Sequence, residues 1–79
     1  MDWREYIVSN PKVLGGKPAV TGTRLAVEFI LGLYASGWTT EQVLRNYPSL
    51  REESLQAVFA YAAEVMHDDT VYPLPAASP

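Results

Sequence analysis

The fold of this chain is decided by the stretch Gly15-Gly16-Lys17-Pro18-Ala19-Val20-Thr21-Gly22-Thr23-Arg24-Leu25-Ala26-Val27. Short runs of apolar and β-branched residues on both sides of Thr21-Gly22 are typical of two extended segments joined by a tight turn, in which glycine reaches positive φ without a steric penalty. Pro18 has no N–H to donate to a ladder, so its segment is expected at a sheet edge. With a further short strand at Glu5–Val8, the sequence predicts a β element of two or three strands between residues 5 and 27.

The spacing of apolar residues changes at Val27, where the helical part begins. Apolar residues then recur at i, i+3, i+4 and i+7 over residues 27–34, which predicts a first helix at about 28–36, closed by Gly37. Thr39 and Gln42 have the spacing of a capping box. They predict a second helix at about 40–47, which Pro48 ends because proline cannot continue a helix.

A third and longest helix is expected at about 51–67. Ser49 and Glu52 repeat the capping-box spacing, and apolar residues follow at helical intervals from Leu55 to Met66. A short turn separates the last two helices, which is typical of a helix-turn-helix arrangement. The apolar period then stops, and the Pro-rich composition predicts a flexible tail over residues 68–79. The sequence therefore predicts a single domain, residues 1–67, that is mainly α: a three-helix bundle preceded by the short β element.

The composition limits the kinds of function. The 79 residues include no cysteine and one histidine, so they offer neither a disulfide nor a metal-binding cluster. His67 lies beside Asp68, but no nucleophile or second acid is spaced to work with them. We therefore expect no catalytic residue, no metal, no cofactor and no enzymatic activity. No secretory signal opens the sequence and no apolar run approaches the ~20 residues of a membrane span, so we expect a cytoplasmic protein without membrane contact.

Charges are unevenly distributed along the chain, whose net charge is −3. Cations dominate residues 1–27 and acids dominate from Glu28 onward, so contact with phosphate is expected at the N-terminal part. The candidate DNA-binding residues are the cations and hydroxyls of the β element and one cation near the third helix: Lys17, Thr21, Thr23, Arg24 and Arg51. Turn chemistry, with Arg24 paired to Glu28 or Glu52, explains the β-element residues without any ligand. Base reading by the third helix is disfavoured, because Glu53 and Glu64 would repel the DNA backbone.

Small residues on the third helix indicate a contact surface. Ala57 and Ala60 share a face with Glu53 and Glu64, opposite the predicted apolar stripe, where they suit the close approach of another helix. A chain this small that is 48% hydrophobic is also expected to cover apolar surface by assembling. We therefore expect a homodimer that uses the β segment, the Ala57/Ala60 face or both.

Several short motifs occur here in the order and spacing of one small prokaryotic family. They are Gly16-Lys17-Pro18, Gly22-Thr23-Arg24, Val27, Gly37, Tyr47-Pro48, Leu50 and Ala60-Tyr61-Ala62. Over about residues 6–64 the chain resembles family four hundred and thirty-three of the domains of unknown function, a homeodomain-like helix-turn-helix group related to VapB-type antitoxins. Arg51 stands where that family usually caps the third helix with Thr or Ser, and Ser54 replaces its second acid. We therefore expect the cap at Ser49.

This resemblance implies the antitoxin of a type II toxin–antitoxin pair, since many family members are encoded beside a PIN-like ribonuclease. Its partners would be that ribonuclease toxin and, in a second role, operator DNA. The tail offers Val71, Tyr72 and Leu74 as apolar anchors for the toxin, and the acidic rear half of the chain suits a basic partner. Two alternatives stay open: a stand-alone helix-turn-helix transcription regulator, and a structural dimerisation module.

Overall fold

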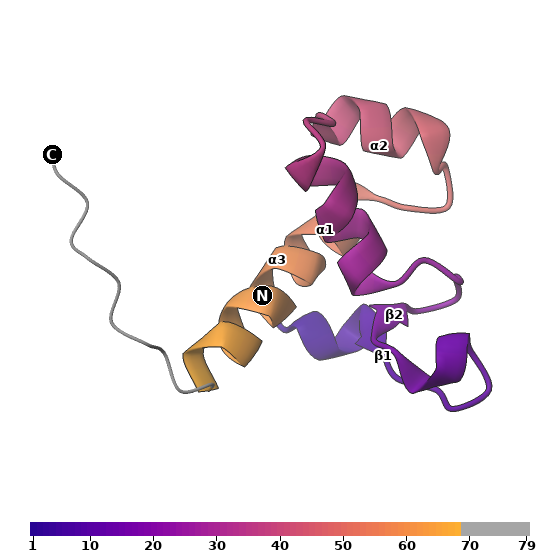
Figure 1. Ribbon diagram of the computed structural model, residues 1–79, viewed down its shortest axis with the longest axis vertical. Coiled ribbons are helices and arrows are strands. Elements are labelled where there is room, and N and C mark those ends of the chain that lie inside the picture. Colours follow the sequence, from indigo (N-terminus) through magenta and orange to yellow (C-terminus); the bar gives the residue numbers. More distant parts are fainter. Residues whose placement is uncertain (69–79) are drawn as a thin grey trace, which may run out of the picture.

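Two short strands and three α-helices follow one another along the chain (Figure 1). The computed structural model describes residues 1–68, so the predicted tail beyond Asp68, with its candidate anchors Val71, Tyr72 and Leu74, lies outside the described residues. The elements are the 3-10 helix η1 (Trp3–Glu5), strand β1 (Ile7–Val8), the 3-10 helix η2 (Leu14–Gly16), strand β2 (Ala19–Val20) and the helices α1 (Val27–Ala35), α2 (Thr40–Asn46) and α3 (Glu52–Asp68).

These elements confirm the prediction of a mainly α protein in which three helices follow a short β element. Each helix begins and ends within one residue of the predicted bounds. No helix among residues 1–68 combines the length and the apolar character needed to cross a membrane.

The sheet pairs β1 with β2. The two strands run antiparallel, with Ile7 opposite Val20 and Val8 opposite Ala19. The short strand expected at residues 5–8 is therefore present. Its partner is the first half of the Gly15–Val27 stretch, a pairing that the prediction of two or three strands over residues 5–27 does not specify.

The tight turn within that stretch forms as predicted. The Thr23 N–H donates to the Val20 carbonyl at 3.0 Å, and Gly22 has a φ of +79°. After the turn, a single bridge joins Ala26 to Ala19. Within residues 1–68 the sheet consists of β1 and β2, so β2 is an edge strand as predicted, and the Ala19–Ala26 bridge is isolated. The proline precedes β2, so its missing N–H interrupts no bond of the ladder.

α1 ends in the glycine motif that the sequence predicts. Gly37 has a φ of +94°, its N–H donates to the Tyr34 carbonyl at 2.9 Å, and the Trp38 N–H donates to the Leu33 carbonyl at 3.0 Å. This pair of bonds is a Schellman motif, which satisfies carbonyls that the helix end leaves without partners.

The predicted N-terminal cap is present in α2 and absent from α3. For α2 the predicted capping box is confirmed: the Gln42 N–H donates to Thr39 Oγ1 at 3.2 Å, and the Thr39 N–H donates to Gln42 Oε1 at 2.8 Å. For α3 the predicted cap at Ser49 is wrong, because the helix begins only at residue 52. The Arg51 N–H instead donates to the buried Ser54 hydroxyl at 3.2 Å, so a side chain three positions into the helix satisfies the backbone before it.

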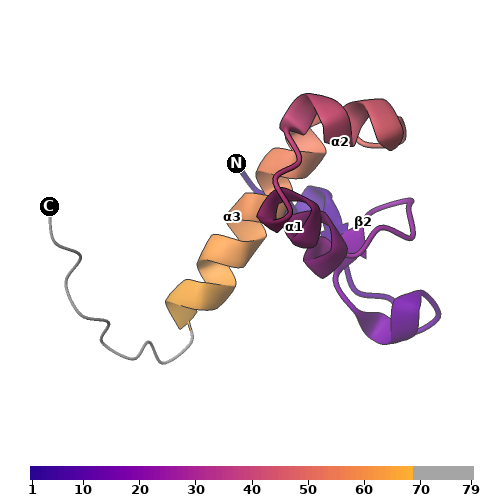
Figure 2. The same cartoon turned by 45° about the horizontal axis from the view of Figure 1, so that its top comes forward.

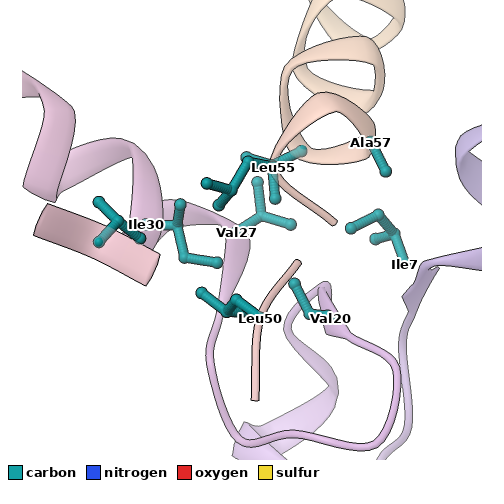
Figure 3. Close-up of a cluster of buried hydrophobic side chains, with 9 residues drawn as sticks. Ile7, Val20, Val27, Ile30, Leu50, Leu55 and Ala57 are labelled. Atoms are coloured by element: carbon teal, nitrogen blue, oxygen red, sulfur yellow. The ribbon is translucent and has the colours of Figure 1, made fainter. Parts of the chain in front are cut away.

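The core lies where the three helices meet the sheet (Figure 3). Its buried members are Ile7, Val20, Val27, Ile30, Val43, Leu50, Leu55, Ala57 and Val58. Ala57 is completely buried and points toward Ile7 of β1. The prediction that Ala57 contacts a partner is therefore wrong, since the chain's own β1 packs there and a small side chain lets the strand approach. Ala60, one turn on, is half-buried.

The N-terminal η1 is fastened to the middle of α3 by an aromatic and ionic cluster. The Trp3 ring packs edge-on against Tyr61 with ring centroids 4.8 Å apart, and Trp3 Nε1–H donates to Glu64 Oε2 at 3.0 Å. The Arg4 guanidinium lies 4.5 Å above the Trp3 ring and pairs with Glu64 at 3.3 Å. We call these four residues the N-terminal clasp. Together with β1, the clasp gives α3 a second covered side.

Candidate functional site

A hollow of about 370 Å³ opens between the β1–β2 loop and the turn after β2, and two cationic side chains line it. Its lining residues are Val8, Asn10, Val13, Lys17, Ala19, Gly22, Thr23 and Arg24. We call it the cationic hollow. Both cations come from the Gly15–Val27 stretch, and the loop of residues 9–16 forms the opposite wall.

That loop is shaped by local hydrogen bonds and unusual backbone angles. Asn10 Oδ1 accepts from the Lys12 N–H at 2.9 Å, which is an Asx turn. Leu14, Gly15 and Gly16 then adopt φ values of 52°, 63° and 87° in succession. Positive φ at a leucine is costly and persists only where the surroundings require it. The loop therefore has a defined shape, and it delivers Lys17 to the hollow directly after these turns.

The structure divides the predicted DNA-binding residues between two places. Lys17, Thr23 and Arg24 line the cationic hollow. Thr21 and Arg51 line a separate hollow of about 190 Å³, together with Glu5, Tyr6, Val20, Ser49 and Ser54. A carboxylate in this second hollow opposes the binding of an anion, so the cationic hollow is the better candidate for phosphate.

The two cations of the hollow differ in how they are engaged. Lys17 Nζ forms an ion pair with the carboxylate of Glu28 on α1, and both side chains are largely exposed. Within residues 1–68, Arg24 has no carboxylate within ion-pair distance. The alternative in which Arg24 pairs with Glu28 or Glu52 is therefore wrong, because Lys17 takes Glu28. Arg24 is the cation whose charge is open to a ligand.

Thr23 stabilises the turn after β2, whereas Thr21 is bonded to the segment before β1. The Thr23 hydroxyl donates to the Val20 carbonyl at 2.8 Å and accepts from the Leu25 N–H at 3.1 Å, so the turn already uses its hydrogen-bonding capacity. Thr21 is exposed, and its backbone N–H donates to the Tyr6 carbonyl at 2.8 Å. Thr23 thus has an architectural role, as the turn-chemistry alternative supposes.

An apolar groove of about 330 Å³ separates α1 from the C-terminal half of α3. It is lined by Lys17, Pro18, Val27, Glu28, Leu31, Tyr61, Ala62, Val65 and Met66. The Lys17–Glu28 ion pair lies at its rim, so the groove and the cationic hollow share Lys17. Exposed apolar surface of this kind marks contact sites on soluble proteins.

Sequence reasoning missed several residues of these two surfaces. Asn10 and Val13 line the cationic hollow, whereas the sequence predicts for Asn10 only a turn before Pro11. Leu31 and Met66 line the groove, although helical periodicity assigns both to the core. Val65 is apolar but lies outside the apolar stripe predicted for the third helix. This position is the one feature of the sequence that could have indicated an exposed apolar surface.

The two hollows and the apolar groove formed by the described residues are surfaces suited to binding. Among residues 1–68, no three His, Cys, Asp or Glu side chains lie together as a metal site would require. The absence of enzymatic activity stays a prediction.

Comparison with known proteins identifies the family of this chain. The family described as "Protein of unknown function (DUF433)" matches residues 7–62. The chain belongs to the DUF433 family. This confirms the family resemblance that the glycine, proline and arginine motifs carry, whereas the VapB-type antitoxin relationship stays a prediction.

The chain is similar to one curated protein and to one solved structure. The "Uncharacterized protein y4eO" of Sinorhizobium fredii (strain NBRC 101917 / NGR234) is 39% identical over 59 residues, which are 75% of this chain and 27% of that protein. A crystal structure of a DUF433 member protein from Anabaena variabilis ATCC 29413 has a TM-score of 0.73 and 30% identity, over 77% of this chain and 60% of that one. The chain thus spans about a quarter of the curated relative and three fifths of the crystallised one.

Proposed function

We propose that this DUF433 protein is a regulatory binding module: the antitoxin of a type II toxin–antitoxin pair, which neutralises a PIN-like ribonuclease and represses its own operon. The observation that carries the proposal is the cationic hollow. An otherwise acidic chain gathers Lys17 and Arg24 in the lining of one hollow, whose described lining residues include no carboxylate. Separate cationic and acidic surfaces suit a protein that binds both DNA and a basic partner. Both partners are met in the cytoplasm.

Operator binding would begin with phosphate at the cationic hollow. Arg24 offers a planar group whose N–H donors match phosphate geometry. The exposed pair between Lys17 and Glu28 contributes little stability, so phosphate can replace the carboxylate at low cost. In a homeodomain-like reading of the fold, α3 would enter the major groove. Glu52 and Glu53 in its first turn are exposed and oppose this, so phosphate contacts by the β element are the better-supported mode.

Toxin binding would use the acidic end of the molecule. Glu41, Glu52 and Glu53 are exposed at the first turns of α2 and α3. Carboxylates in this position complement the cations with which a ribonuclease holds RNA. The apolar tail residues Val71, Tyr72 and Leu74 would anchor the complex, a role that rests on the sequence alone.

A stand-alone helix-turn-helix regulator is the second candidate, and the same cationic hollow favours it. The two proposals differ in one respect, since only an antitoxin relieves the toxicity of a neighbouring gene product. A purely structural dimerisation module would show neither activity.

The decisive experiment expresses the product of the neighbouring gene with and without this chain. We expect growth arrest by that product alone and relief on co-expression. Truncation after His67 should abolish relief if the tail anchors the toxin, and it should leave the thermal midpoint unchanged. No growth arrest, or arrest that this chain does not relieve, would refute the antitoxin proposal.

A parallel measurement follows binding to promoter DNA by fluorescence anisotropy. Arg24→Ala should weaken binding, whereas Lys12→Ala is the matched control because Lys12 is a cation of the β1–β2 loop, which borders the hollow, but does not line it. DNA binding without neutralisation would identify the stand-alone regulator. Equal losses for both variants would show that the hollow has no special role.

A further inference from the structure

Four residues in the C-terminal half of α3 form an exposed apolar stripe. Phe59, Ala62, Ala63 and Met66 are spaced at i, i+3, i+4 and i+7, so they lie on one side of the helix. The side chains of Phe59 and Met66 are 45% and 68% exposed, and Ala63 is also exposed. Periodicity places Phe59 and Met66 in the core, and the structure places them outside it. We call this stripe the α3 seam.

Within residues 1–68 the seam is largely uncovered. The N-terminal clasp and β1 occupy other sides of α3 through Trp3 and Ala57. At the first residue of the seam, Tyr34 of α1 packs against Phe59 with ring centroids 5.0 Å apart, and farther along, the apolar groove lies between α1 and the seam residues Ala62 and Met66. Both views of the fold show the last turns of α3 extending beyond α1 and α2 (Figures 1 and 2). A second helix therefore has room to lie along the seam.

We propose that a second copy of the chain covers the seam by antiparallel packing of α3 against α3. The seam reads large-small-small-large, and this order is the same in both directions along the helix. A two-fold axis between Ala62 and Ala63 would place Met66 of each copy beside Phe59 of the other. An isologous interface requires this self-complementarity, and a partner of another kind would have no reason to match it.

The side chains suit this packing. Alanines at the crossing point let two helix backbones approach closely, near the lower end of the usual 8–10 Å between axes. A methionine sulfur beside an aromatic ring is a favourable contact. No seam residue is charged, so the two copies meet there without like-charge repulsion.

The available surface also fits a dimer. The seam spans about 12 Å of helix. Its four side chains alone are too few to bury the roughly 800 Å² per partner of a stable interface. The apolar groove continues this surface, since it shares Ala62 and Met66 with the seam and adds Leu31 and Val65. Among its described lining residues, the charged ones are Lys17 and Glu28, which form an ion pair that is neutral as a unit. The interface therefore moves from the predicted Ala57/Ala60 face to another side of α3.

Sedimentation or light scattering of the full chain tests the proposal. We expect a mass of twice 8.8 kDa at micromolar concentration. Met66→Glu should weaken the dimer about tenfold or more, because it places a carboxylate against an apolar surface. Val8→Glu is the matched control, since Val8 is as exposed as Phe59 but lies on β1. Met66→Glu combined with Phe59→Lys should restore the dimer, because the antiparallel register brings the two new charges together.

Cross-linking tests the register independently, and the absence of native cysteine makes the readout clean. In the proposed register, the two copies of residue 63 are offset by about 1.5 Å along the helices and those of residue 67 by about 13 Å. Ala63→Cys should form an intermolecular disulfide under mild oxidation, and His67→Cys should not. A monomeric chain, a dimer unaffected by Met66→Glu, or equal cross-linking at both positions would overturn the proposal.

Discussion

Replacing Trp3 with alanine should remove about 3 kcal/mol of stability, although this residue lies at the edge of the fold. Its edge-on contact with Tyr61 at 4.8 Å contributes about 0.5–1.5 kcal/mol beyond area burial. The Nε1–H bond to Glu64 adds about 1 kcal/mol, because the carboxylate is 42% exposed and solvent screens it. Burial of the half-covered ring adds about 1 kcal/mol more.

A loss of this size is large for a chain of 79 residues, whose total stability is expected at about 4–12 kcal/mol. The thermal midpoint should fall by about 12–24 °C, since each kcal/mol is worth about 4–8 °C in a domain of this size. Trp3→Phe keeps an aromatic ring but loses the hydrogen bond and part of the ring area, so it should lose about 1–2 kcal/mol. Arg4→Ala should cost under about 0.5 kcal/mol, because its ion pairs are exposed.

Urea unfolding followed by far-UV circular dichroism measures these differences, and Trp38 remains as a fluorescent probe in each Trp3 variant. The order of stability should be wild type, Arg4→Ala, Trp3→Phe, Trp3→Ala. A loss below about 0.5 kcal/mol for Trp3→Ala would show that the clasp does not hold η1 to α3, and the reasoning would fail.

Three further predictions concern single features of the structure. Gly37→Ala should destabilise by about 1–2 kcal/mol in urea unfolding, since a φ of +94° strains any residue with a Cβ although no atom lies within 4 Å of that position. Thr39→Ala should cost about 0.5–2 kcal/mol by the same measurement, through loss of the α2 cap. In promoter-DNA titrations, Lys17→Ala and Arg24→Ala should each reduce the slope of log K against log salt by about one, and Glu28→Gln should raise affinity by releasing Lys17. Unchanged slopes would count against the cationic hollow as a phosphate site.

The features that the sequence predicts well are those controlled by neighbouring residues. Gly37 ends α1 and Thr39 caps α2 because each motif is complete within five or six positions of the chain. The start of α3 is predicted to within one residue, but its cap is not, although the chemistry is equally local. Both Ser49 and Ser54 can accept a backbone hydrogen bond, and in the structure the buried Ser54 hydroxyl accepts it from the Arg51 N–H.

Contacts between distant parts of the chain were harder to predict. A two-residue strand carries too little alternation to select its partner, so the pairing of Ile7 with Val20 was not expected. Ala57 has the same sequence signature whether it faces a partner or its own β1. Apolar periodicity likewise cannot distinguish a residue that meets the core, such as Val58, from one that meets solvent, such as Met66.

The sequence predicts that Lys17, Thr23 and Arg24 lie close together at the candidate site. It does not predict that the five candidate DNA-binding residues lie in two separate hollows. Thr21 and Arg51 belong to another hollow, because Thr21 bonds to Tyr6 beside the segment that precedes α3. The ion pair between Lys17 and Glu28 depends on how α1 leaves the sheet, which no local pattern specifies.

The clasp has a consequence for the order in which the fold is completed during synthesis. Trp3 and Glu64 are separated by 61 positions, and β1 likewise relies on Ala57 for cover. Because η1 and β1 precede α3 in the chain, they must wait for that helix during synthesis before their apolar residues are sequestered. Until then Ile7 and Trp3 are open to chaperones and proteases, as expected where stabilising contacts are distant in the chain. For the same reason, unfolding of α3 would expose the apolar residues of η1 and β1 together.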